Sequence, residues 1–295
     1  ATDANLSPVW GLSLARGLTE LLVVAARASL ISDVVFLVRT VPDDGAERQQ
    51  WIATHRRPDG PELARRMNDE LATALTRAAR ETGARLVYLA NPDNPMGSWH
   101  PGARITAMLD DLPASSLLVL DEAYAEFAPD DAIPRIDPND DRAIRLRTFS
   151  KAYGMAGARI GYAIGPAELI AGFDRIRNHF GINRIAQAGA LAALQDQDWL
   201  NHIRAEVATA RARITEIADE NGLTALPSAT NFVAIDCRRD GAFARALLDA
   251  LAVRGIFARM PGVAPMDRCI RVSCGPAEEL DAFAGALPAA LRAIL

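Results

Sequence analysis

Apolar residues along this chain follow two alternating patterns: short continuous runs, and longer segments in which apolar residues recur every three or four positions. The first pattern is typical of buried strands and the second of amphipathic helices. Residues 61–82 show the helical pattern, with a proline in the first turn and Gly83 just after the end. Four apolar residues share one face of this predicted helix: Leu63, Met67, Leu71 and Leu75.

Four apolar runs have the length of buried strands. They cover residues 85–90, 116–120, 143–149 and 159–164. Strands that alternate with helices predict a mainly parallel sheet with helices on both faces. The acidic, proline-containing residues 128–141 are predicted to form a surface loop.

The C-terminal third predicts a second, smaller unit. Residues 199–221 predict one long helix, which Gly222 ends. The elements expected after it are strands at 231–236, 255–260 and 269–273 and helices at 241–254 and 277–294. We therefore predict an α/β protein with a large domain over residues 1–197, atypical in its N-terminal part, and a small α+β domain over residues 198–295.

The composition argues against several classes of protein. With 295 residues, about half of them hydrophobic, the chain can bury a large core. Its net charge is −5 and its arginines are dispersed among carboxylates, so nucleic-acid binding is not expected. The four histidines lack the spacing of metal ligands, and we predict no metal site.

The cellular location is inferred from the cysteines and from one long apolar segment. The three cysteines are Cys237, Cys269 and Cys274. They form no CxxC pair, and an odd number fits reduced thiols in the cytoplasm. Residues 21–38 are apolar but contain Arg27 and Asp33, so we interpret them as a buried helix followed by a strand rather than as a membrane span. We expect a cytoplasmic protein without a membrane partner.

The basic residues are unusual, because all 32 except Lys151 are arginines. An arginine guanidinium stays protonated, whereas a desolvated lysine can lose its proton and attack an aldehyde. Amine chemistry and a bias in composition explain the count equally well. The neighbouring residues must therefore decide between them.

Polar residues follow the predicted strands at the sheet edge where ligands bind in such folds. We expect Asn94, Asp121 and Lys151 to gather there. Lys151 suits a Schiff base with an aldehyde cofactor, Asp121 suits a ring nitrogen, and Asn94 and Tyr124 suit a phenolic oxygen. These are the requirements of pyridoxal 5′-phosphate.

The phosphate of that cofactor requires a hydroxyl and a cation, and Ser150 and Arg159 flank the lysine with both. Each feature also has an ordinary structural explanation when it is taken alone. An Asp-Glu pair can start a helix, Asn-Pro can form a turn, and Arg271 in an apolar strand can belong to an internal ion pair.

Four segments together resemble the signature segments of class I/II aminotransferases. They are residues 91–97 (Asn-Pro-Asp-Asn-Pro-Met-Gly), residues 121–124 (Asp-Glu-Ala-Tyr), Ser150-Lys151 with Arg159 after it, and Arg271 within residues 270–273. Their order and spacing are most similar to the histidinol-phosphate aminotransferase branch. The resemblance implies a fold-type I structure that binds pyridoxal 5′-phosphate.

The resemblance also implies a role for each matching residue. Lys151 would form the internal aldimine and then move a proton, and Asp121 would keep the pyridine nitrogen protonated. Arg271, together with Asn94, would bind the substrate, with the arginine holding the α-carboxylate in a bidentate fork.

The N-terminal third departs from the family pattern. Gly17 and Thr19, in Gly-Leu-Thr-Glu, are predicted to form the turn that binds the phosphate. The first tyrosine of the chain is Tyr88, although the family usually has an earlier one that reaches the neighbouring subunit. No aromatic residue lies at residues 40–45, where a ring is expected to stack on the pyridine. Phe36, Trp51 and His55 are the candidates to replace it, and Met96 stands in place of the usual threonine.

We therefore predict an aminotransferase that moves an amino group between an amino acid, or histidinol phosphate, and a 2-oxo acid, with a role in histidine biosynthesis. The resemblance implies a homodimer with small-molecule substrates. Two alternatives stay open: another reaction of the same cofactor, such as decarboxylation or elimination, and a non-catalytic scaffold that has lost the phosphate-binding turn.

Overall fold

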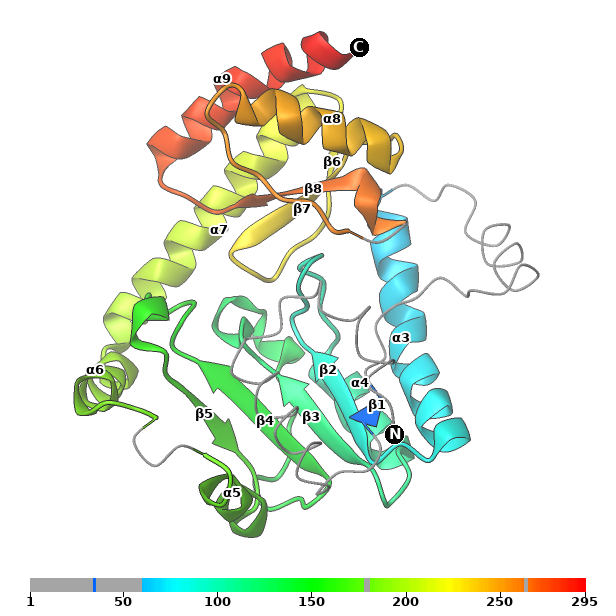
Figure 1. Ribbon diagram of the computed structural model, residues 1–295, viewed down its shortest axis with the longest axis vertical. Helices are drawn as coiled ribbons and strands as arrows, with labels where there is room; N and C mark the ends of the chain where they lie inside the picture. The colour runs from blue at the N-terminus through cyan, green and yellow to red at the C-terminus, as the bar shows by residue number, and fades with distance from the viewer. Residues whose placement is uncertain (1–33, 36–59, 178–180, 263–264) are drawn as a thin grey trace.

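Two β-sheets organise the chain (Figure 1). The computed structural model describes residues 34–35, 60–177, 181–262 and 265–295. The larger sheet has the order β1-β2-β3-β4-β5, and its strands are β1 (Val34–Val35), β2 (Leu86–Ala90), β3 (Leu117–Asp121), β4 (Ala143–Thr148) and β5 (Gly161–Ile164). The first four are parallel, as predicted.

Strand β5 is the exception, because it runs antiparallel to β4. A parallel return needs a crossover connection, usually an α-helix. Between β4 and β5 the chain forms only the short 3₁₀ turn η4 (Ala156–Ala158), which cannot carry it back across the sheet. This short return is the segment that contains Lys151.

Helices cover both faces of the larger sheet (Figure 1). Helices α3 (Gly60–Thr82) and α4 (Gly102–Asp111) pack on one face, against buried residues that include Val87, Leu118 and Leu120. Helix α5 (Ala167–Asp174) packs on the other face with Leu86, Val119 and Ile144. Successive residues along β2 therefore belong alternately to two apolar clusters, one on each face of the sheet, and the same holds along β3. This explains why both strands are continuously apolar.

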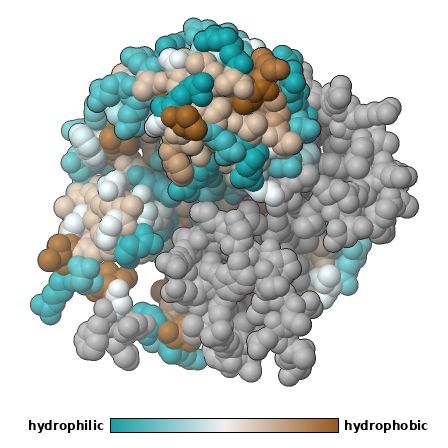
Figure 2. Space-filling view, turned by 45° about the horizontal axis from the view of Figure 1, so that its top comes forward, coloured by the Kyte–Doolittle hydropathy of each residue, from teal (hydrophilic) through white to brown (hydrophobic). Residues whose placement is uncertain are grey.

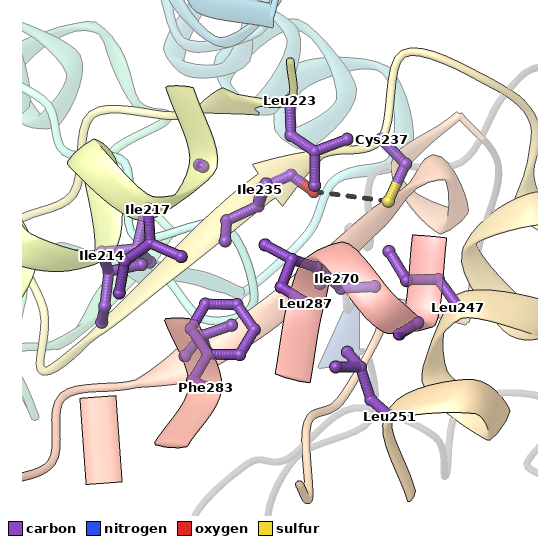
Figure 3. Packing of buried hydrophobic residues seen from close by; sticks show 14 of the residues in the cluster. Ile214, Ile217, Leu223, Ile235, Cys237, Leu247, Leu251, Ile270, Phe283 and Leu287 are labelled. Carbon is purple, nitrogen blue, oxygen red and sulfur yellow. Dashed lines mark hydrogen bonds between the residues drawn. The ribbon is translucent and has the colours of Figure 1, made fainter. Parts of the chain in front are cut away.

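The second unit is built on the antiparallel sheet β6-β7-β8. Its strands are β6 (Thr224–Ala225), β7 (Phe232–Asp236) and β8 (Cys269–Ser273), and its helices are α7 (Gln197–Glu220), α8 (Gly241–Ala252) and α9 (Ala277–Ile294). Figure 3 shows the core of this unit, where Ile214 and Ile217 of α7 meet Ile270 of β8 and Phe283 of α9. Helix α7 extends from this unit towards the larger sheet (Figure 1), and the domain boundary at residues 197/198 stays a prediction.

Two predictions from the sequence are wrong. Residues 255–260 do not form a strand: Gly255 has a φ of +79° after α8, Phe257 is 82% exposed, and only Arg259 makes a single β-bridge, with Arg271. The loop over residues 128–141 is irregular, with the 3₁₀ turn η3 (Asp130–Ala132), but it is not wholly at the surface. Its buried apolar residues are Ala128, Ala132 and Ile136.

The remaining global predictions have mixed outcomes. All three cysteines are free thiols, as expected. No helix in the described ranges is long and apolar enough to cross a membrane. Of the apolar residues 21–38, only Val34 and Val35 are described, and they form β1. Short helix α6 (Arg184–Gln195), like α4 and α5, was not predicted.

Candidate active site

Two consecutive carboxylates at the end of β3 have different surroundings. Glu122 is only 1% exposed and lies between two arginines of β4. Arg145 donates to both of its oxygens, at 2.7 and 3.0 Å, and Arg147 donates to Oε2 at 2.9 Å. Arg147 also reaches Glu126 at 3.2 Å. The charge of Glu122 is thus compensated within the protein, and this residue ties β4 to the end of β3.

Asp121 contacts a different set of groups. Its Oδ2 accepts a hydrogen bond from the Tyr88 hydroxyl, and its Oδ1 accepts one from the Ala123 N–H at 2.9 Å. No arginine forms an ion pair with Asp121 among the residues that the structure describes. Burial raises the pKa of the Asp121 carboxyl above its usual value, and the Tyr88 hydrogen bond and the charge of Lys151 oppose that rise. A cationic ring nitrogen would complete this site by stabilising the carboxylate form.

Lys151 lies in the same region as Asp121 and Tyr124. Its Nζ is 5.1 Å from the centroid of the Tyr124 ring. That buried ring forms a T-shaped pair with Phe232 of β7, with the centroids 5.6 Å apart and the planes at 88°. The structure therefore brings Lys151 and Asp121 together, as the strand-end argument predicts, and Tyr124 lies beside the lysine.

Arg271 joins this group from the second sheet. Its guanidinium carbon lies 4.6 Å from the Phe232 ring centroid, and its Nη1 donates to Oδ1 of Asn94. Desolvation lowers the pKa of Arg271, although Tyr124 opposes this effect. Asn94 and Arg271, predicted from distant parts of the sequence to bind one substrate, are thus in contact. Phe232 contacts both Tyr124 and Arg271, and sequence reasoning missed it because its side chain carries no polar atom.

The loop that carries Asn94 is held in place by Asn91 and Gly97. The buried Asn91 side chain donates to Ala132 O at 2.9 Å and accepts from His100 N at 2.7 Å. Gly97 has a φ of +79°, and a Cβ at this position would collide with Ser228 of the second unit. Asn91 is therefore a cross-link between loops rather than the closure of a local turn, and Gly97 allows the two units to approach.

Ser150 and Arg159, the two predicted phosphate ligands beside the lysine, are neighbours. Arg159 Nη1 lies 3.5 Å from Ser150 Oγ and donates to Ala156 O at 2.7 Å. Arg159 has a left-handed backbone, with a φ of 52°. The other predicted phosphate ligands, Gly17 and Thr19, lie outside the described residues. So do the three candidate stacking residues: Phe36, Trp51 and His55.

A second arginine beside Arg271 was not predicted. The backbones of Arg259 and Arg271 exchange two hydrogen bonds, of 3.1 and 2.6 Å, and the charge of Arg259 lowers the pKa of Arg271. The exposed Arg259 guanidinium lies 5.7 Å from the Phe257 ring, and within the described ranges it forms no ion pair. In the sequence, Arg259 is noticeable as an arginine within an apolar run. It was overlooked because residues 255–260 were wrongly predicted to form a strand. The described residues contain no cluster of ligands for a metal ion.

The order of these residues along the chain is that of a known family. The model of the family "Aminotransferase class I and II" matches residues 67–287, which include the described residues of this site. The chain belongs to this family. A solved structure of histidinol-phosphate aminotransferase from Sinorhizobium meliloti, in complex with pyridoxal-5′-phosphate, is 45% identical, with a TM-score of 0.77. The match covers 92% of this chain and 75% of that one, and it confirms the predicted fold-type I class.

Two curated relatives of this chain are also named histidinol-phosphate aminotransferase, like the solved structure. Histidinol-phosphate aminotransferase 1 of Mesorhizobium japonicum is 38% identical over 229 residues, which are 75% of this chain and 61% of the relative. Histidinol-phosphate aminotransferase of Bacillus pumilus is 38% identical over 202 residues, which are 68% of this chain and 54% of the relative. The chain thus spans a little over half the length of the curated relatives it matches.

Proposed function

We propose that this chain is a pyridoxal-phosphate-dependent aminotransferase that acts on an amino acid or histidinol phosphate and a 2-oxo acid. The observation that carries the proposal is Asp121, a carboxylate without an arginine partner in the described part of the chain, placed near the only lysine. The family match and the names of the relatives support it. These names also favour transamination over decarboxylation or elimination.

The residues present fit the cofactor. Asp121 would hold the ring nitrogen, Asn94 and Tyr124 the phenolic oxygen, and Ser150 and Arg159 the phosphate. When bound, the cofactor supplies an aldehyde and a ring that withdraws electrons from the substrate α-carbon. Lys151 would move the proton at that carbon, a contribution typically worth about 10²–10⁴-fold in rate.

The test of this reaction type is an analysis of the cofactor after one half-reaction. The protein is loaded with pyridoxal 5′-phosphate and given an amino donor without an acceptor. Transamination is expected to leave the cofactor as pyridoxamine 5′-phosphate and to release a 2-oxo acid. Release of carbon dioxide or of an eliminated group, with the cofactor still an aldehyde, would contradict the proposal.

The two arginines suggest how the anionic group of the substrate, a carboxylate or a phosphate, is bound. Arg271 would hold the α-carboxylate of an amino acid or the equivalent group of another substrate. Arg259, beside it and exposed, is proposed to bind the same group when that group is a phosphate, which carries more negative charge than a carboxylate. Both proposed roles rest on where the guanidinium groups lie. That of Arg271 lies at the Phe232 ring and that of Arg259 at the Phe257 ring.

Arg259→Ala is expected to raise KM for histidinol phosphate by about 10–100-fold, because a hydrogen bond to a charged group contributes roughly 1.5–3 kcal/mol. KM for alanine, whose single-charge carboxylate would be held by Arg271 alone, should stay the same. Steady-state kinetics with both donors measure this difference. Arg239→Ala is the control, because Arg239 is stacked on Phe243 at 4.8 Å in the same manner. An equal change for both donors would contradict the role.

We propose that the chain forms a homodimer through α6 and the start of α7. Four large apolar side chains are exposed there: Ile185, Leu191, Leu194 and Trp199. Figure 2 shows hydrophobic surface on its left, the side on which α6 lies in Figure 1. Exposed apolar residues gathered on one element are typical of protein interfaces. A cytoplasmic location is proposed as well, supported by the three free thiols.

Ile185→Asp is expected to weaken the dimer at least about tenfold, because it places a charge in an apolar interface. Sedimentation equilibrium measures the dissociation constant. The control is Val253→Asp, since Val253 is 87% exposed and lies at the end of α8, outside this surface. If both variants dissociate alike, or the wild type is monomeric, α6 is not the interface.

A further inference from the structure

Tyr88 is the side chain that contacts the Asp121 carboxylate from the neighbouring strand. In the parallel pair β2–β3, Tyr88 is opposite Val119 and Ala90 is opposite Asp121, so all four residues lie on one face of the sheet. The Tyr88 ring packs with Leu86 and Val119 in the apolar cluster of that face. Its hydroxyl donates to Asp121 Oδ2 at the strand end. The packing therefore fixes the direction from which this donor approaches.

The two oxygens of Asp121 are held by two different donors. Tyr88 binds Oδ2 and the Ala123 N–H binds Oδ1, so rotation of the carboxylate breaks both hydrogen bonds. Burial raises the pKa of Tyr88, and the negative charge of Asp121 raises it further. Tyr88 thus stays a neutral phenol at working pH and acts as the donor. In the described part of the chain, the charged groups that act on Asp121 are Glu122 and Lys151.

We propose that Tyr88 is a positioning residue that keeps Asp121 ionised and aimed at the ring nitrogen of the cofactor. The inference rests on the proposed function. A hydroxyl that donates to a carboxylate favours its ionised form. Without this donor the carboxylate is more basic and keeps the proton that the ring nitrogen needs in order to be charged. Tyr88 thereby assists the withdrawal of electrons from the substrate without touching the substrate.

The test uses the apoprotein and pyridoxamine 5′-phosphate, because this amine form of the cofactor binds without a covalent bond to Lys151. Its dissociation constant is measured against pH for the wild type and for Tyr88→Phe. Binding needs an ionised Asp121, so affinity falls as pH drops below the pKa of Asp121 in the apoprotein. Removal of the Tyr88 hydroxyl raises that pKa. In Tyr88→Phe the loss of affinity should therefore begin about one pH unit higher than in the wild type. At pH values below both pKa values of Asp121, the variant should bind about tenfold more weakly than the wild type.

Three further variants sharpen the test. Tyr162→Phe removes another partly buried phenol of the same sheet, whose pKa is also raised by burial, and it should leave the profile unchanged. Tyr88→Leu, which keeps an apolar side chain, should give the same shift as Tyr88→Phe. In an Asp121→Asn background, Tyr88→Phe should have no further effect. Thermal unfolding confirms that each variant is folded.

Identical pH profiles for the wild type and both Tyr88 variants would overturn the inference and leave the proposed function intact. A shift of equal size in Tyr162→Phe would also overturn it. If the wild type does not bind pyridoxamine 5′-phosphate at any pH, the proposed function itself fails. The two failures are therefore distinguishable.

Discussion

Lys151→Ala is expected to abolish transamination and to leave the fold intact. Lys151 is the only lysine of the chain, so no other amine can take over its chemistry through a small shift in position. Loss of a positioned general acid–base group lowers the rate by about 10²–10⁴-fold, and loss of the nucleophilic amine adds to that. The cation–π contact with Tyr124, at 5.1 Å, is a small contribution to stability. The measurements are the rate of amino transfer and the thermal unfolding curve.

Lys151→Arg is the matched variant for this prediction. It keeps the positive charge near Asp121 and Tyr124 but cannot lose its proton at neutral pH. We expect it to be as inactive as Lys151→Ala, because the reaction needs the amine rather than the charge. Full activity in the alanine variant would refute the assigned role. Activity in the arginine variant alone would show that Lys151 acts only as a cation.

Glu122→Gln is expected to destabilise the fold by about 3–5 kcal/mol, since it removes one charge from a buried ionic network. Glu122 contacts both Arg145 and Arg147, and after the change Glu126 is the one carboxylate among the described residues that still pairs with these arginines. The glutamine keeps the shape of the side chain, so the loss reflects the missing charge rather than a cavity. Denaturant unfolding measures the free energy.

The control for Glu122 is Asp140→Asn. Asp140 pairs with Arg142 at 2.8 Å, but this pair is more exposed to solvent. An exposed pair contributes only about 0–1 kcal/mol. The two variants should therefore differ several-fold in their effect on stability. Equal and small effects would show that the network beneath the strand end is not required for the fold.

The parallel strands were predictable because burial on two faces leaves a continuous apolar run in the sequence. Strands β2, β3 and β4 lie within one or two residues of their predicted positions. The antiparallel direction of β5 was not predicted, because hydropathy does not encode strand direction, although the interval between residues 149 and 159 is too short for a parallel crossover. Residues 255–260 were wrongly assigned because an apolar run was taken as buried, although Phe257 is exposed.

The candidate site was predictable where its residues lie in motifs and not where it depends on contacts between strands. Asp121, Lys151 and Arg271 were identified from the chemistry of their side chains and from their order. Tyr88 and Phe232 were missed because their roles arise from strand register and from ring packing. Glu122, adjacent to Asp121, was interpreted only as part of the family motif or as a helix start, because its two arginine partners on β4 come close only in the folded sheet.

The central claim is that Lys151 and Asp121 form a working pyridoxal-phosphate site in this chain. A visible absorption titration of the purified protein with pyridoxal 5′-phosphate tests it most directly, before and after addition of amino donors and with Lys151→Ala alongside. The account predicts a band that requires Lys151 and bleaches when a donor is added. The absence of a band at saturating cofactor would contradict it and would favour a non-catalytic scaffold.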